Sequence, residues 1–147
     1  MMGRVLLSLA FMALAGSAWA EMPGTCQVAE HLIERDFPLP KVTRALAAKQ
    51  LDILVLGAGS SQLPGPNGVK NAYPARLQAA LAELFPGVAV KVTTDVSSRR
   101  TADQMVKTLP PALAAAKPAL MIWQTGTVDA MQSIDLDQFK AALDRGI

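Results

Sequence analysis

The stretch LDILVLGAGSS occupies residues 51–61, and the rest of the chain is organised around it. Five of the six residues from Leu51 to Leu56 are aliphatic, which is typical of a parallel strand covered on both faces. Gly57 and Gly59 then allow a tight turn in which backbone N–H groups can approach a ligand closely. Because ligands bind at the carboxyl ends of strands in open α/β sheets, the turn that ends at Ser61 is the first candidate site.

Two more strands follow, each after a helical segment. Residues 88–93 alternate between apolar and polar side chains, and the polar Lys91 and Thr93 favour an edge strand. Residues 119–123 are nearly all apolar and predict a third strand. Right-handed connections then predict an α/β fold in which helices cover both faces of a parallel sheet. The strand order 2-1-3 of a three-layer flavodoxin-like sandwich fits the polar second strand at one edge.

The helices have recognisable starts and stops. Pro74 suits the first turn of a helix that Pro86-Gly87 ends. Thr101-Ala102-Asp103-Gln104 has the form of a capping box, and Pro110-Pro111 is expected to interrupt the helix that it starts. A last helix is expected to begin near Asp135.

The segment before the first strand predicts export. Arg4, an apolar run over residues 5–14 and the site Ala18-Trp19-Ala20 are typical of a secretory signal peptide at residues 1–20. The alternative is an uncleaved anchor. After cleavage, the expected protein is periplasmic or secreted, without a transmembrane anchor. Residues 21–50 would form a helical lead-in, and residues 51–147 the α/β domain.

Composition excludes several classes of function. The formal net charge is only +2, which gives no reason to expect a nucleic-acid partner. The basic pair Arg99-Arg100 is read as a solvated loop. One cysteine, Cys26, and one histidine, His31, supply neither an internal disulfide nor the ligands of a structural zinc site. No metal and no cofactor are therefore expected.

Three strands are few for a sheet of this kind. The third would form a bare apolar edge, which soluble proteins normally avoid. We therefore expect the sheet to be incomplete at the C-terminus. Either further strands belong after Ile147, or the edge pairs with another chain.

Three motifs carry a resemblance to a known family. They are Gly57-Ala58-Gly59-Ser60-Ser61 after the first strand, Tyr73-Pro74-Ala75-Arg76-Leu77 at the start of a helix, and the stretch WQTGTVDA at residues 123–130. Together they resemble the SGNH/GDSL hydrolases, and among these an exported bacterial subgroup of esterase-like proteins. The resemblance implies a flavodoxin-like fold that cleaves acyl or acetyl esters, with cell-envelope glycans as one substrate class.

The resemblance also implies a nucleophilic serine just after the first strand. Counting back from Tyr73-Pro74, the matching position is Gly59. Ser60 or Ser61 could serve as the nucleophile if the turn is shifted by one residue. Their other role would be to cap the turn that follows them.

In the family, a glycine after the second strand and an asparagine after the third complete the oxyanion hole. The glycine position falls at Ser97 or Ser98, and the asparagine position at Val128, whose side chain has no donor. Gly126 and Asp129 match the family. The aspartate and histidine that lie near the C-terminus in the family have no counterpart in this chain.

Three functions stay open. The first is an exported esterase-like protein that is catalytically incompetent and binds a small ester or a glycan. The second is an active serine esterase that uses Ser60 or Ser61 with a base from missing sequence or from a partner chain. The third is a non-functional truncated fragment. Acyl transfer by serine needs a neighbouring base, and the single histidine, His31, lies before the first strand.

Overall fold

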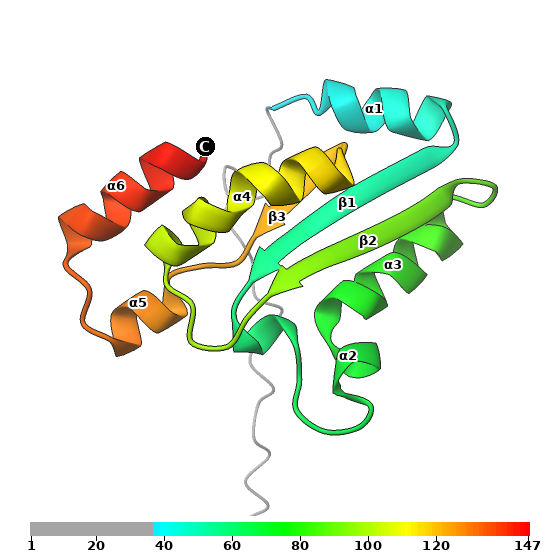
Figure 1. Cartoon of the computed structure of the whole chain (residues 1–147). Coiled ribbons are helices and arrows are strands. Elements are labelled where there is room, and N and C mark those ends of the chain that lie inside the picture. The colour runs from blue at the N-terminus through cyan, green and yellow to red at the C-terminus, as the bar shows by residue number, and fades with distance from the viewer. Residues whose placement is uncertain (1–36) are drawn as a thin grey trace, which may run out of the picture. The chain divides into compact units, whose positions relative to one another are not determined.

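A computed structural model of the chain describes residues 37–147, which form one unit (Figure 1). The predicted signal peptide, Cys26 and His31 lie outside these residues. Of the helices in residues 37–147, none has the length and apolar character that crossing a bilayer requires.

A parallel sheet of three strands lies at the centre of this unit, in the order β2-β1-β3. β1 spans Gln50–Gly57, β2 spans Ala89–Val96 and β3 spans Leu120–Trp123. The predicted strands, their parallel pairing and their order are confirmed. β1 is the central strand, which explains why its run of aliphatic side chains is buried from Ile53 to Leu56.

Helices cover both faces of the sheet, which confirms the three-layer prediction (Figure 1). Leu54 and Leu56 of β1 pack against Met105 and Leu109 of α4 (Ala102–Ala116). The residues of β1 that alternate with Leu54 and Leu56 point to the opposite face of the sheet, where α3 (Tyr73–Leu84) packs against β2. Since successive side chains of a strand point to opposite faces, α3 and α4 lie on opposite sides of the sheet.

The start signals in the sequence act as predicted. Thr101 and Gln104 form the capping box at the start of α4, and Pro74 lies in the first turn of α3. The Asp135 side chain accepts hydrogen bonds from the first backbone N–H groups of α6. The remaining helical elements are short or peripheral: α1 Pro40–Ala47, the 3₁₀ turn η2 Gly59–Ser61, α2 Gly68–Asn71, α5 Thr127–Met131 and α6 Leu136–Gly146.

The prediction that Pro110-Pro111 interrupts a helix is wrong, because α4 continues through both prolines to Ala116. Both proline side chains face solvent. Residues on the other side of the same helix, Leu109 and Ala112 among them, pack against the core on either side of this point. The burial of that face outweighs the two missing backbone hydrogen bonds.

Candidate ligand-binding site

The turn after β1 is built around a buried serine. Ser61 is 3% exposed, and its backbone N–H donates to the carbonyl of Ala58 at 2.9 Å. Its side chain folds back under Gly57, where a Cβ would stand 2.2 Å from Ser61 Oγ. A side chain at position 57 would therefore clash with Ser61, so the position requires glycine.

Gln124, the first residue after β3, holds both serines of this turn. Ser61 Oγ donates a hydrogen bond to Gln124 Oε1. Gln124 Nε2 in turn donates to Ser60 Oγ at 3.0 Å. One amide side chain therefore fixes the two hydroxyl groups that the sequence offers as nucleophiles, and joins the end of β1 to the end of β3.

Gly59, which the sequence resemblance places at the nucleophile position, has more space around it than Gly57 does. A Cβ built on Gly59 would lie 3.4 Å from Ser98 Oγ, an ordinary van der Waals contact. Its φ is also outside the left-handed region, which among the glycines holds only Gly65, Gly87 and Gly126 in the described part of the chain. Neither space nor backbone conformation requires a glycine at position 59.

The prediction of a solvated loop is wrong for Arg100, which is 8% exposed. Its guanidinium forms an ion pair with Asp95 at 2.9 Å and donates to the Asp95 carbonyl at 2.6 Å. It also donates to the Gly57 carbonyl at 3.3 Å and to Thr108 Oγ1 at 3.2 Å. These contacts compensate the cost of burying the charge. Arg99, by contrast, is exposed, as expected.

Asp129 is 4% exposed and caps a helix. Both of its carboxylate oxygens accept from the backbone N–H of Ala102, at 3.0 and 3.1 Å, at the start of α4. A negative charge at this position also interacts favourably with the helix dipole. Gly126, with φ +96°, makes the turn from β3 into α5 that brings Asp129 there.

A cleft of about 320 Å³ opens at the carboxyl ends of the strands. Among the predicted site residues, it is lined by Gly59, Ser60, Ser98 and Val128. Ser61 does not line it and instead lines a separate hollow beside α3, and Ser97 donates its N–H to the Gly57 carbonyl at 3.3 Å. The remaining lining residues are Ala58, Arg99, Thr127, Met131 and Gln132.

No histidine of residues 37–147 lines the cleft, and the single histidine, His31, lies outside the described residues. Within residues 37–147, no three histidine, cysteine or acidic residues come together in a way that could hold a metal ion. Sequence reasoning missed two residues that organise this site, Gln124 and Arg100. The only signal for either was its place directly after a strand or beside a helix start, where a side chain reaches the carboxyl edge of the sheet.

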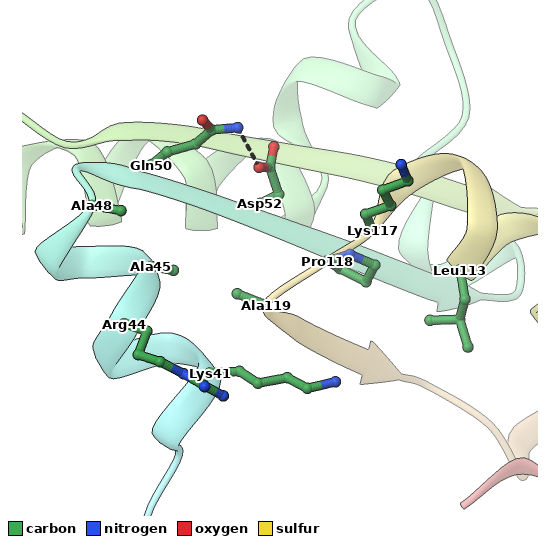
Figure 2. Close-up of a pocket in the computed structure, with 10 residues that line it drawn as sticks. All are labelled: Lys41, Arg44, Ala45, Ala48, Gln50, Asp52, Leu113, Lys117, Pro118 and Ala119. Atoms are coloured by element: carbon green, nitrogen blue, oxygen red, sulfur yellow. Dashed lines mark hydrogen bonds between the residues drawn. The ribbon is translucent and has the colours of Figure 1, made fainter.

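A larger hollow of about 660 Å³ lies at the opposite end of the sheet, between α1 and the end of α4 (Figure 2). Lys41 and Arg44 of α1 and Lys117 lie around it. Asp52 accepts a hydrogen bond from Gln50 at 2.7 Å in its wall. We place the candidate site in the smaller cleft, because in open α/β sheets ligands bind at the carboxyl ends of the strands.

A family model described as the non-GDSL lipase-like family matches residues 25–147. None of the curated proteins searched matches the chain.

Several solved structures share the fold. TesA is 27% identical with a TM-score of 0.56, over 64% of this chain and 51% of TesA. AlinE4, an SGNH-hydrolase family esterase, is 19% identical with a TM-score of 0.57, over 66% and 51% of the two chains. The psychrotrophic esterase EstA from Pseudoalteromonas is 15% identical with a TM-score of 0.54, over 66% and 50%. The matched part of this chain thus covers about half the length of each.

Proposed function

Because this chain belongs to the non-GDSL lipase-like family, we propose that its cleft binds an acyl or acetyl ester without hydrolysing it. The resemblance to the SGNH/GDSL hydrolases is thereby confirmed, and ester hydrolysis is the activity of that wider group.

The observation that carries the proposal is the environment of the two serines beside Gly59. The hydroxyl of Ser61 donates a hydrogen bond to the amide oxygen of Gln124. A serine hydroxyl becomes a nucleophile only when a neighbouring base accepts its proton in the reaction. An amide oxygen accepts a hydrogen bond but does not take up a proton at neutral pH. Ser61 is also buried, and Ser60 accepts a hydrogen bond from the same amide.

The walls of the cleft suit the acyl part of an ester. Ala58, Val128 and Met131 supply apolar surface, and the Met131 side chain at the rim is 80% exposed. A flexible thioether adapts to ligands of different shape. Ser60 and Ser98 supply a few hydroxyl groups, and a mainly apolar pocket with few polar groups is typical of small-molecule sites.

Hydrolysis of p-nitrophenyl acetate by the purified chain tests the catalytic half of the proposal. We expect the rate to equal that of the double variant Ser60→Ala/Ser61→Ala, and no adduct on either serine after treatment with a fluorophosphonate. A higher rate in the unmodified chain, together with a labelled Ser60 or Ser61, would instead establish a serine esterase.

Ligand binding is tested separately by saturation-transfer NMR with p-nitrophenyl acetate. Val128→Trp should fill the cleft and abolish the transfer, whereas Val69→Trp, a change at an exposed valine outside the cleft, should leave it unchanged. If the unmodified chain shows no transfer, the cleft does not bind esters and the proposal fails.

An active esterase completed by a second chain is the other candidate. It is favoured by the edge of β3, which within residues 37–147 pairs only with β1. A strand from a second chain that pairs with β3 would add to this edge of the sheet, and the second chain would then supply the general base. Light scattering that finds only monomers, combined with absent turnover, would remove this candidate.

Export to the periplasm or the medium is our proposal for the location. It rests on the signal-peptide pattern of residues 1–20. N-terminal sequencing of the protein from cells should give Glu21 as the first residue. A first residue at Met1 would contradict cleavage.

A further inference from the structure

Arg100 uses four of its five N–H groups in the contacts described above. Nη1 donates to Asp95 and Thr108, and Nη2 donates to Gly57 and to the Asp95 backbone. The fifth donor, the Nε–H group, is buried and has no partner among the described residues. An unmade hydrogen bond of a buried charged group is costly, so this donor indicates that something else accepts from it.

Thr125 supplies a second buried group of the same kind. Its hydroxyl oxygen, Oγ1, is buried without a hydrogen-bond partner among the described residues. Arg100 and Thr125 both line a small cavity of about 10 Å³ that adjoins the cleft. Two of the three unpartnered buried side-chain atoms in this part of the chain thus belong to residues that surround one cavity.

We propose that this cavity binds one water molecule, which accepts a hydrogen bond from Arg100 Nε and donates one to Thr125 Oγ1. A cavity of about 10–15 Å³ holds one water when two or more polar partners line it. The size excludes larger ligands, and the Nε–H group, a donor only, needs an acceptor. Water supplies an acceptor and donors in one molecule.

The water would complete a connection among all three strand ends. Arg100 directly joins the end of β1 at Gly57 to the end of β2 at Asp95. Through the water, the same guanidinium would reach Thr125, two residues beyond the end of β3. Ser60 and Val128 line both this cavity and the cleft. Arg100 is therefore a positioning residue, which sets the cleft walls relative to one another.

A crystal structure of the whole chain at high resolution tests the proposal directly. We expect density for one water within hydrogen-bond distance of Arg100 Nε and Thr125 Oγ1. Density without a water, or a direct hydrogen bond between the two side chains, would overturn the proposal.

Three threonine variants separate the role of the hydroxyl from that of the methyl group. Thr125→Val keeps the shape and removes the hydroxyl, whereas Thr125→Ser keeps the hydroxyl and removes the methyl. Thr93→Val makes the same change at an exposed threonine of β2 that lines neither the cavity nor the cleft. Denaturant unfolding should give an unfolding equilibrium constant about 5 to 100 times larger for Thr125→Val than for the unmodified chain. The water would lose one of its two partners, which weakens the hydrogen bond to the buried Arg100 Nε–H group.

The expected order supports a hydroxyl that binds water. The stability of Thr125→Ser should lie closer to that of the unmodified chain than the stability of Thr125→Val does, and Thr93→Val should be as stable as the unmodified chain. If Thr125→Ser is the less stable of the two Thr125 variants, the methyl contacts explain the site and the proposal is wrong. If Thr125→Val is as stable as Thr93→Val, the hydroxyl contributes nothing and the proposal is also wrong.

Discussion

Ser61 and Gln124 are separated by 63 positions in the sequence, and the hydroxyl of Ser61 donates a hydrogen bond to the side-chain carbonyl of Gln124. This contact joins the turn after the central strand to the end of β3. It holds the buried serine away from the cleft and leaves Gly59 at its wall. The contact is a structural restraint, and in the proposed function it also leaves the Ser61 hydroxyl without a base.

Replacing Gln124 with leucine removes this restraint while keeping a similar volume. Ser61 would then be a buried hydroxyl without its partner, which typically costs about 1–3 kcal/mol. We expect chemical denaturation to show a loss of this size for Gln124→Leu. Gln138→Leu, at an exposed position on α6, should cost less than about 0.5 kcal/mol. Equal stability of the two variants would contradict the assigned role.

The two glycines of the turn should respond oppositely to the same change. A Cβ at Gly57 would lie 2.2 Å from Ser61 Oγ and 2.9 Å from Ser61 Cβ. Gly57→Ala should therefore destabilise the fold by about 1–3 kcal/mol, as overpacking does in a buried turn.

Gly59→Ala introduces only an ordinary contact with Ser98. We expect its melting temperature to equal or exceed that of the unmodified chain, because alanine also restricts the unfolded state. Thermal melts of the two variants under identical conditions compare them. A Gly59→Ala variant as unstable as Gly57→Ala would show that the turn differs from this geometry.

Asp129 belongs to the stretch on which the resemblance to the SGNH/GDSL hydrolases was based, and its contacts here are those of a helix cap. Asp129→Asn keeps one acceptor for the Ala102 N–H but removes the charge at the start of α4. We expect a loss of about 1–2 kcal/mol, measured by urea unfolding. Ligand transfer in the NMR experiment should persist in the folded variant. Loss of binding with unchanged stability would assign Asp129 to the ligand instead.

The ion pairs that Asp103 forms with Lys107 and Arg145 near the start of α4 make the stability of the fold depend on pH. A hydrogen bond with Lys107, followed by the charges of Lys107 and Arg145, holds the pKa of Asp103 below its ordinary value of 3.8. The folded state therefore keeps the carboxylate charged at a lower pH than the unfolded chain does. The stabilisation is complete above the ordinary pKa and disappears as the pH falls through the lowered one.

Melting temperatures of Asp103→Asn and of the unmodified chain test this direction. The difference should favour the unmodified chain at neutral pH and shrink as the solution is acidified below the ordinary pKa of aspartate. Asp137→Asn is the control, because Asp137 lies 3.6 Å from Lys140 with its side chain 90% exposed. A difference that grows on acidification would contradict the sign of the pKa shift.

Local patterns predicted the framework of this protein. The aliphatic run of β1, the alternation in β2 and the capping box at Thr101 each depend on residues next to one another in the sequence. Strand order followed from the polar residues of the second strand, which favour an edge position as in flavodoxin-like folds. The cleft at the carboxyl edge also followed, because parallel strands place their ends together.

Tertiary structure alone decided what the individual side chains in that cleft do. Arg100 looked like half of a solvated pair, but Asp95, Gly57 and Thr108 surround its guanidinium once the strands and α4 come together. Pro110 looked like the end of a helix, but the core on the opposite side of α4 holds the helix intact. The physical reason is the same in both cases. A local sequence pattern reflects the conformation that a segment prefers by itself, whereas burial and hydrogen bonding depend on partners from distant segments.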